Sequence, residues 1–583
     1  MQFKILAQRM KKLESISSRN KMIEILSNIF NEASEEEIGS ICYFLLGQIY
    51  PSYIDTTLGL GDKMIQSAIS LAADVRKQKV EDKIKEMGDL GEVAAEMIKN
   101  RKNRFKRFFD AKNALSVKEV KDGLEKIAEA SGEGSQDVKK KTLAAIFIGA
   151  DKIERKYIGR LVAGTMRLGL GDMTILDALS VAFFGDKSKR PELEHAYNVS
   201  SDIGYVAEVL KKSGLPGVER IRVSIDRPLK PMLAQRVSQF SDVREKISSK
   251  KIAAEEKYDG ERVQVHKNRK KVTLFSRRLN DITSQFPDVV ENVKKNVEAE
   301  KAILDGEVVA YDFEKKGYYP FQKIMHRRRK YEVEEYAEKI PVKYMLFDIM
   351  YLNGRSMMRE PYQERRKKLK EVVGNKKYIA LAGRKVSSNL DRIEDFFKEC
   401  MERDLEGIVC KSCSDDSYYR AGAREWTWIK WKREYASELG DTLDLVVVGA
   451  YAGHGKRAHT YGSLLCAAYN YEDDAFETVS KLGTGLTDKQ LNNLPHKLGE
   501  YKRGEKPVRV RAQGEVEPDF WFSPSLVLEV KAAEITRSPV HTCGREKGKG
   551  LALRFPRFKR WRPDKEADQA TTTKEIVEMY EQQ

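Results

Sequence analysis

The sequence has few of the residues that cross-link small secreted folds or hold structural metals. Only six cysteines and seven histidines occur in 583 residues. The cysteines are too scattered for a secreted disulfide framework, and a chain of this length can bury a core without one. We therefore expect reduced thiols and a cytoplasmic protein. Cys410 and Cys413 form a CxxC pair, but no second pair stands at zinc-ligand spacing, so we interpret them as unrelated thiols.

Long apolar runs are also missing. No stretch approaches the roughly 18 uninterrupted apolar residues that a membrane-spanning helix needs. Residues 1–13 mix Lys and Arg with short apolar runs, whereas a secretory signal has a continuous apolar centre. We expect neither a membrane span nor a secretory signal.

Positive charge is in excess. Lys and Arg number 106 against 89 Asp and Glu, for a net charge of +17 and a pI near 9.2. Such an excess is expected where a polyanion must be attracted and held, although a single Lys-rich run such as 139–141 fits a solvated helix face. Apolar residues make up 41% of the chain, which is ordinary for a globular protein, and the length suggests three or four domains.

Three patterns follow one another along the chain. Helical spacing of apolar residues, as over 22–30, predicts an all-α domain over 1–222. Short strands with helical segments between them predict an α+β domain over 223–434. Short strands with glycine-rich turns predict a β-barrel of the OB type over 435–583. The predicted strands are 262–266, 272–276, 302–310 and 342–349 in the second domain, and 443–448, 464–469, 508–516 and 526–531 in the third.

The string Leu-Gly-Leu-Gly-Asp occurs at 58–62 and again at 168–172, each time before a segment with helical periodicity. Glycines before a helix let backbone amides approach a phosphate. An aspartate in the first turn of a helix explains the same string without a ligand, and both interpretations stay open.

A series of short motifs in a fixed order carries the chemistry, although each is weak by itself. In chain order they are Glu255–Arg262, Phe275–Arg278, Leu304–Glu307, Leu346–Asp348, Glu406–Lys411, Trp428–Lys432 and Arg554–Phe558, with Arg562, Asp564 and Lys565 beyond the last. In this order the series closely resembles ATP-dependent DNA ligases of the archaeal and eukaryotic type, which belong to the covalent nucleotidyltransferase superfamily.

The resemblance implies a helical DNA-binding domain, an α+β adenylation (nucleotidyltransferase) domain and an OB-fold domain. It also implies three steps: a lysine attacks the α-phosphate of ATP, AMP passes to a 5′-phosphate at a nick, and a 3′-hydroxyl displaces AMP. Lys257 matches the nucleophile. A lysine amine is protonated at neutral pH unless burial or nearby cations disfavour the ammonium, and we expect Arg262, Lys430 and Lys432 to supply those cations.

The same residue-level match assigns the nucleotide contacts. It implies adenine contacts for Glu255 and Phe347, ribose contacts for Arg277 and Glu307, and phosphate contacts for Arg424, Lys430 and Lys432. Glu406 matches the family's metal-binding carboxylate, and we expect Glu307 to bind the same metal ion. That ion is expected to be Mg²⁺, with Mn²⁺ as the alternative. Arg554–Phe558 would orient the departing pyrophosphate, but Arg554 and Arg557 fit DNA contact equally.

The implied partner is nicked double-stranded DNA, bound by a monomer. The basic run 326–330 fits either a phosphate-backbone contact or a solvated face. Residues 102–109 resemble a sliding-clamp-binding box without its leading glutamine, but Phe105, Phe108 and Phe109 also fit the buried face of a helix.

Two other functions compete with DNA ligation. An RNA ligase or an mRNA-capping guanylyltransferase would share Lys257 and the cleft, but it needs no long helical domain to spread contacts over many phosphates. A non-catalytic DNA-binding scaffold would have no need to keep an acid, a lysine and the paired motif lysines together.

Overall fold

The computed structural model describes residues 1–583 except 17, 55, 99–114, 226, 238, 320, 328–331, 375, 433–441, 454–459, 533 and 583. The described chain divides into two compact units. Unit 1 holds residues 1–197 and 201–221, and unit 2 holds 198–200 and 222–583. The predicted boundary at residue 434 falls outside the described residues, and the predicted domain limits stay predictions.

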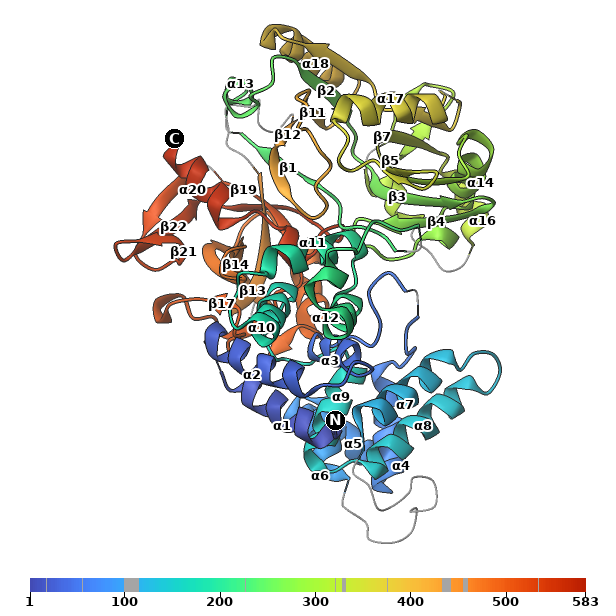
Figure 1. Cartoon of the computed structure of the whole chain (residues 1–583). Coiled ribbons are helices and arrows are strands. Elements are labelled where there is room, and N and C mark those ends of the chain that lie inside the picture. Colours follow the sequence, from blue (N-terminus) through green and yellow to red (C-terminus); the bar gives the residue numbers. More distant parts are fainter. Residues whose placement is uncertain are drawn as a thin grey trace. The chain divides into compact units, whose positions relative to one another are not determined.

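Unit 1 is built from helices in its described residues, as the apolar spacing predicts (Figure 1). They are α1 (Phe3–Glu14), α2 (Arg19–Glu32), α3 (Ile38–Leu45), α4 (Asp62–Ala73), α5 (Lys77–Met87), α6 (Leu90–Met97), α7 (Val117–Glu129), α8 (Ser135–Gly149), α9 (Lys152–Val162), α10 (Asp172–Phe184), α11 (Arg190–Ser200) and α12 (Ile203–Val218). Capping boxes at Ser116 and Asp151 begin α7 and α9, because these side chains accept hydrogen bonds from amides that the first helical turn leaves unpaired.

Both Leu-Gly-Leu-Gly-Asp strings lead directly into helices. Their aspartates, Asp62 and Asp172, stand in the first turns of α4 and α10. Gly59 and Gly169 have φ angles of 60° and 67°, a left-handed conformation that favours glycine. The strings therefore act as helix starts, and phosphate contact by them stays a prediction.

The first part of unit 2 contains two sheets. One has the strand order β1 (Leu233–Arg236), β12 (Arg424–Lys432), β11 (Gly407–Ser412), β2 (Ile252–Lys257) and β10 (Arg384–Ser387). The other has the order β4 (Lys271–Ser276), β3 (Glu261–Asn268), β5 (Lys301–Asp312), β7 (Val342–Leu352) and β8 (Arg355–Ser356), with β6 (Gly317–Tyr318) on β5 and β9 (Ile379–Leu381) on β7. All four predicted strands of this part are confirmed.

Helices bury apolar faces against both sheets. These helices are α13 (Asp242–Lys246), α14 (Pro287–Asn296), α15 (Phe321–Met325), α16 (Val333–Lys339), α17 (Tyr362–Val372) and α18 (Leu390–Glu402). Val293 of α14 and Leu369 of α17 share a core with strands β3, β5 and β7. Phe397 of α18 shares a second core with β2 and β11. The edges of the two sheets that carry the motifs are thereby fixed on apolar cores.

The second part of unit 2 is rich in strands, in agreement with the expected OB-type domain. Its larger sheet has the order β16 (Lys502–Arg503), β18 (Phe520–Phe522), β13 (Thr442–Ala452), β14 (Tyr461–Asn470), β15 (Ala475–Leu482) and β17 (Val510–Arg511), with β19 (Val527–Lys531) on β13 and β23 (Arg557–Trp561) on β19. A smaller sheet has the order β20 (Glu534–Ser538), β22 (Lys549–Arg554) and β21 (Cys543–Glu546), and the helices are α19 (Asp488–Gly499) and α20 (Thr573–Glu581).

One predicted strand of this part is wrong. Only Val510 and Arg511 of the segment 508–516 pair in a sheet, and Gly514–Val516 forms a 3-10 turn. The apolar residues of this segment are separated by Gly514, which lacks a side chain to pack and favours leaving the sheet. The other predicted strands, 443–448, 464–469 and 526–531, correspond to β13, β14 and β19.

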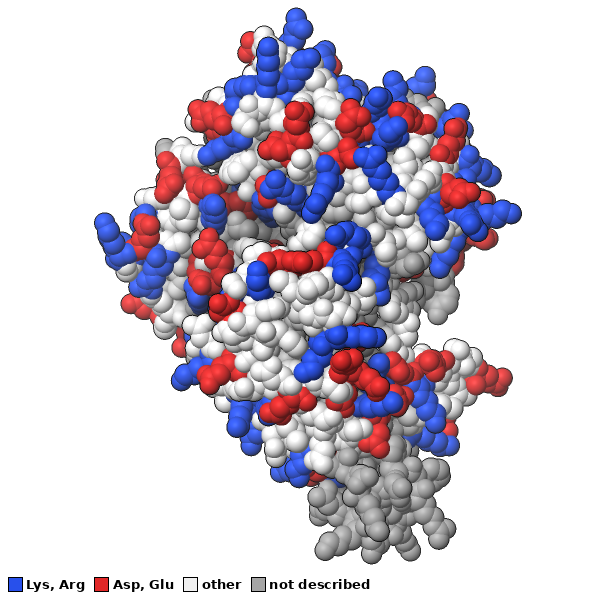
Figure 2. Space-filling model, in the orientation of Figure 1, with Lys and Arg blue, Asp and Glu red and all other residues white. Residues whose placement is uncertain are grey.

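Several further expectations have structural outcomes. All six cysteines are free, including Cys410 and Cys413. Within the described ranges, the helices are too short or too polar to cross a membrane. The same ranges contain no group of three or more His, Cys, Asp or Glu side chains placed to hold a metal ion. Lys and Arg are interspersed with Asp and Glu over the face in Figure 2, so the charge excess is not gathered into one patch on it.

The basic run 326–330 and the aromatic motif 102–109, each of which the sequence leaves with two interpretations, fall largely outside the described residues. Arg327 is described and buried, and its Nη2 pairs with Asp288 Oδ1 at 2.6 Å, so this member of the run 326–330 stabilises the fold. Residues 328–330 and Phe105, Phe108 and Phe109 lie outside the described residues, and clamp binding stays a prediction.

His541 provides a test of the buried core of the strand-rich part. Burial lowers the pKa of His541 to about 4, whereas an unfolded histidine titrates near about 6.5. As the pH falls from about 6.5 to about 4, the unfolded chain binds a proton that the folded chain does not, so stability present at neutral pH is lost. Between pH 7.5 and pH 5 we expect this histidine to lower the free energy of unfolding by about 2 kcal/mol.

The measurement is urea unfolding of wild type and His541→Leu at both pH values. The variant should lose about 2 kcal/mol less than wild type on acidification. His496 is exposed on α19, and His496→Leu is the control, expected to follow wild type. Equal acid sensitivity of all three proteins would contradict the assignment of a buried neutral His541.

Candidate active site

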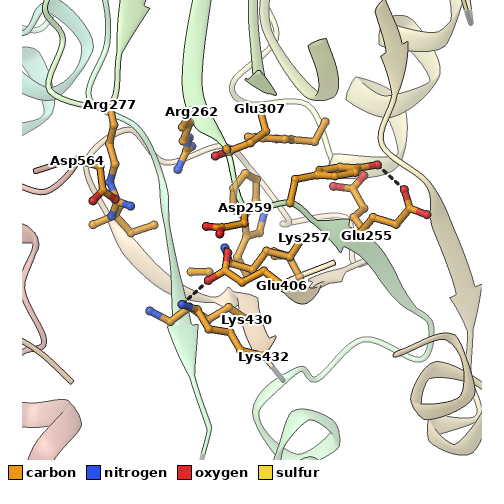
Figure 3. Close-up of a pocket in the computed structure, with 18 of the residues that line it drawn as sticks. Glu255, Lys257, Asp259, Arg262, Arg277, Glu307, Glu406, Lys430, Lys432 and Asp564 are labelled. Carbon is orange, nitrogen blue, oxygen red and sulfur yellow. Dashed lines mark hydrogen bonds and ion pairs between the residues drawn. The ribbon is translucent and has the colours of Figure 1, made fainter. Parts of the chain in front are cut away.

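A pocket in unit 2 collects the motifs that lie far apart in the sequence. All ten side chains predicted for the site line it, and their roles stay predictions: Glu255, Lys257, Arg262, Arg277, Glu307, Phe347, Glu406, Arg424, Lys430 and Lys432. Figure 3 shows Lys257, Glu406, Lys430 and Lys432 together on one side of Asp259, with Arg262 and Glu307 on another. The first group meets because β12, β11 and β2 are neighbours in one sheet, whereas Arg262 and Glu307 stand on the paired strands β3 and β5 of the other sheet.

Lys257 ends strand β2, and its amine pairs with a carboxylate. Lys257 Nζ donates to Glu406 Oε2, and Lys432 Nζ pairs with Glu406 Oε1. The backbone fixes this trio, because Gly407 stands opposite Lys257 in one strand pair and opposite Lys432 in the other. A Cβ at Gly407 would lie 2.0 Å from the Trp431 carbonyl oxygen, so glycine is required for this close strand contact.

The environment of Glu406 keeps it ionised. Burial alone would raise the pKa of Glu406, but the charges of Lys257 and Lys432 outweigh burial and hold it well below its usual value. The expected cations Arg262, Lys430 and Lys432 line the same pocket, but the direct partner of the Lys257 amine is an anion, Glu406, which the sequence did not predict. An amine held in this way is positioned but not yet free to attack.

Arg262 is likewise committed to a carboxylate. Its Nε and Nη2 donate to Asp305 at 3.1 and 2.7 Å, and its Nη1 donates to the Met232 carbonyl oxygen at 2.8 Å. Tyr419 donates to the same Asp305 at 2.9 Å. Arg262 thus lines the pocket as a member of an ion pair with Asp305, and its expected influence on Lys257 stays a prediction.

Two further carboxyl groups face the same part of the pocket. Burial raises the pKa of Glu307 to about 8, although Lys257 and Arg262 act against this shift. Burial, followed by the charge of Glu406, raises the pKa of Asp259. The charge of Glu406 contributes to both raised pKa values, and a divalent ion would offset this repulsion between carboxyl groups. Glu307 and the ionised Glu406 therefore fit Mg²⁺ if substrate phosphates complete its oxygen ligands.

The opposite end of the pocket combines aromatic rings with a buried ion pair. Glu255 accepts from Tyr362 at 2.6 Å and Arg366 at 3.1 Å, and Lys411 Nζ lies 2.6 Å from its other oxygen. Lys411 Nζ also lies 5.0 Å from the ring centre of Phe347 and 4.0 Å from that of Trp428. Burial lowers the pKa of Lys411. This end offers flat apolar surfaces with fixed charges behind them.

Cations gather at the end near the C-terminal strands. Burial, followed by Lys565 and Arg424, holds the pKa of Lys430 well below its usual value, and burial lowers that of Arg277 to about 10. Arg424 pairs with Glu575 of α20. Arg560, Arg562, Asp564 and Lys565 also line the pocket, and Figure 3 shows Asp564 beside Arg277.

Arg554 and Arg557 do not occur among the described residues that line the pocket. Arg554 pairs with Glu534 at 3.2 Å, and both side chains are about half exposed. Arg562 and Lys565, which lie beyond this motif, line the pocket instead, and contact of residues 554–558 with pyrophosphate or DNA stays a prediction.

Sequence reasoning missed several residues of the site. Asp259, Asp305 and Lys411 lie inside quoted motifs, and their charge was the available signal. Tyr362 and Arg366 of α17 contact Glu255 from a segment that carries no motif. Only the packing of α17 on β7 could identify them.

Comparison with known proteins agrees with this architecture. Residues 2–180 match the family described as DNA ligase N terminus, residues 231–432 match the ATP dependent DNA ligase domain, and residues 457–565 match the ATP dependent DNA ligase C terminal region. The DNA ligase of Sulfurisphaera tokodaii is 43% identical over 587 residues, which cover 100% of this chain and 97% of that protein.

DNA ligase 1 of Methanosarcina acetivorans is 44% identical over 588 residues, which cover 100% of both chains. Among solved structures, mycobacterial DNA ligase D complexed with ATP and MES matches 59% of this chain and 97% of its own, with 24% identity and a TM-score of 0.33. Since the family matches extend over most of the chain and the relatives align along its whole length, the chain belongs to the ATP-dependent DNA ligases.

Proposed function

We propose that Lys257 is the nucleophile of this ATP-dependent DNA ligase, which seals nicks in duplex DNA by forming phosphodiester bonds. The observation that carries the proposal is the trio of Lys257, Glu406 and Lys432, in which the amine is held at the wall of the pocket by a carboxylate that a second lysine shares. A phosphoramidate between lysine and AMP keeps the transfer potential of the nucleotide, which later steps need.

The first step forms a bond between Lys257 Nζ and the α-phosphorus of ATP and releases pyrophosphate. The amine must leave its ion pair with Glu406 and lose a proton to water before its lone pair can attack. Lys430 and Lys432 line the same pocket and would stabilise the negative charge that develops on the phosphoryl oxygens. AMP then passes to the 5′-phosphate at the nick, and the 3′-hydroxyl displaces it.

The other roles follow the position of each residue in the pocket. Phe347 would stack on adenine, and Glu255 would act beside it through the network with Tyr362, Arg366 and Lys411. Arg277 and Glu307 would contact the ribose. Arg424 would exchange Glu575 for a phosphate of ATP, and Arg562 and Lys565 would meet the pyrophosphate.

Glu307 and Glu406 would hold a divalent cation, Mg²⁺ or Mn²⁺, which when bound neutralises phosphate charge and polarises the phosphoryl oxygens. We also propose that the protein acts as a monomer, as the family resemblance implies. The cytoplasmic location and the sliding-clamp contact stay predictions.

The competing functions have less support. An RNA ligase or a capping guanylyltransferase does not account for the match of residues 2–180 to the DNA ligase N terminus. A DNA-binding scaffold does not account for a pocket lined by every charged side chain that the family resemblance predicts for nucleotide binding, from Glu255 to Lys432.

Substitution of the proposed nucleophile is the direct test. Wild type incubated with ATP and magnesium should gain one AMP by intact-protein mass spectrometry, and peptide mapping should locate it on Lys257. Lys257→Ala should gain none, because the side chain that forms the P–N bond is gone. Lys251 is exposed directly before β2, and Lys251→Ala should adenylate normally.

The nucleotide used and the strand sealed separate the competing functions. Label retained from α-labelled ATP supports a ligase, label from GTP supports capping, and label from neither supports a scaffold. Sealing of a nicked DNA duplex then separates a DNA ligase from an RNA ligase. Full adenylation of Lys257→Ala would refute the assignment of the nucleophile.

The raised pKa of Glu307 predicts a pH-dependent metal requirement. Because the pKa of Glu307 is about 8, its carboxyl is mostly protonated at pH 7 and must lose that proton to bind a cation. The magnesium concentration that gives half-maximal adenylation should therefore fall by roughly tenfold per pH unit as the pH rises toward about 8. Titration of magnesium at pH 6.5, 7.5 and 8.5 measures this.

The matched variant is Glu307→Gln, which cannot ionise. Its magnesium requirement should be higher than that of wild type at pH 8.5 and should change little with pH. A wild-type requirement that stays constant over this range would contradict metal binding by Glu307.

A further inference from the structure

Two carboxylates lie side by side beneath the cationic end of the pocket. Asp444 of β13 stands directly opposite Glu529 of β19, and Glu529 stands opposite Arg560 of β23. Residues paired in this way project on the same face of a sheet. Asp444 and Glu529 are nearly buried, and neither belongs to the residues that line the pocket. They form a layer behind the lining side chains.

Asp444 contacts two of the cations that do line the pocket. Arg562 Nη1 donates to its two oxygens at 3.0 and 3.1 Å, and Lys565 Nζ pairs with one of them. The remaining donors of Arg562, Nε and Nη2, contact Asp564 at 3.0 and 2.7 Å. Arg562 is thus held between two carboxylates, which fixes the plane and direction of its guanidinium.

The charge balance explains why a carboxylate is needed behind these cations. Arg277, Lys430, Arg562 and Lys565 line one end of the pocket, and like charges at short range in a poorly solvated site repel strongly. Asp444 and Glu529 offset that repulsion from behind. Glu529 accepts a hydrogen bond from Arg560 at 2.8 Å and lies 3.6 Å from Arg562. Of the two carboxylates, Asp444 is therefore the one that contacts both Arg562 and Lys565.

We infer that Asp444 is a positioning residue for the first step of the reaction, because it holds Arg562 and Lys565 toward the β- and γ-phosphates of ATP. The inference rests on the proposed function. In that step the bond between Lys257 Nζ and the α-phosphorus forms, the bond from that phosphorus to the bridging oxygen breaks, and pyrophosphate leaves with the electron pair. The amine proton goes to water. Arg562 and Lys565 then stabilise the charge on the leaving group.

The role is specific to one step. The sealing step releases AMP from a 5′-adenylated nick, and no pyrophosphate takes part. Loss of Asp444 should therefore slow adenylation and leave sealing of a pre-adenylated nick unaffected. A merely structural role in the strand-rich domain would impair both.

The test compares wild type with the variant Asp444→Asn. One assay measures the rate at which the protein takes AMP from ATP, and a parallel assay measures sealing of a synthetic 5′-adenylated nick. We expect kcat/KM for adenylation to fall about tenfold or more, since misplaced phosphate-binding groups lose transition-state stabilisation. Sealing should stay within about twofold of wild type. If Asp444 contributed only its negative charge and did not position Arg562 and Lys565, kcat/KM for adenylation in Asp444→Asn would stay unchanged or rise, and the inference would be overturned.

Two further variants complete the design. Asp444→Glu keeps the charge with a longer reach and should recover adenylation to within about threefold of wild type. If Asp444→Asn does not fold, Asp444→Glu is measured alone, and its smaller loss of adenylation, up to about threefold, should exceed any loss of sealing; losses that are equal in the two steps would overturn the inference. Asp474 is also nearly buried and pairs with an arginine, Arg509, in the same domain, but it does not line the pocket. Asp474→Asn should adenylate within about twofold of wild type at a temperature where it is folded.

Wild-type kcat/KM in Asp444→Asn, or equal losses in both steps, would overturn the inference. Failure of the wild-type protein to gain AMP would instead overturn the proposed function, and it is recognised before any variant is made.

Discussion

The site depends on one shared carboxylate. Glu406 binds the amine of Lys257 through one oxygen and that of Lys432 through the other. Three neighbouring strands, β2, β11 and β12, bring these side chains together, and the missing side chain of Gly407 allows the strands their close approach. The two lysines offset the cost of burying the Glu406 charge, so the nucleophile is held in place before any substrate arrives.

Cations of the pocket repeatedly have a carboxylate behind them. Asp305 holds Arg262, Asp444 holds Arg562 and Lys565, and Glu575 holds Arg424. A carboxylate partner fixes the direction of a long flexible side chain, which otherwise loses much rotational freedom when it binds a phosphate. The partners are drawn from different elements, β5, β13 and α20, so the pocket depends on packing throughout unit 2. This arrangement favours an electrostatically prepared site for phosphate transfer.

These ion pairs also show that a positively charged side chain in a motif is not necessarily available to bind a substrate. Arg327 belongs to the most basic run of the sequence, yet it is buried against Asp288. Arg262 belongs to the nucleophile motif, yet its donors are occupied by Asp305 and the backbone. The sign of a charge predicts attraction to a polyanion, but only its neighbours decide whether a given side chain is available to a substrate.

The sequence by itself determined the helical first part, the strands that carry the motifs, and the set of side chains from Glu255 to Lys432 that line one pocket. These could be predicted because apolar periodicity is local and because the ordered motifs resemble one family over nearly the whole chain. The weak strand at 508–516 was wrong, since an apolar pattern interrupted by Gly514 does not specify a sheet partner. Tertiary structure alone decided that Glu406 lies between Lys257 and Lys432, that Glu255 contacts Tyr362 and Arg366, and that Asp444 lies beneath Arg562. These contacts join residues far apart in the chain, and strand order and helix packing set them, which no local pattern encodes.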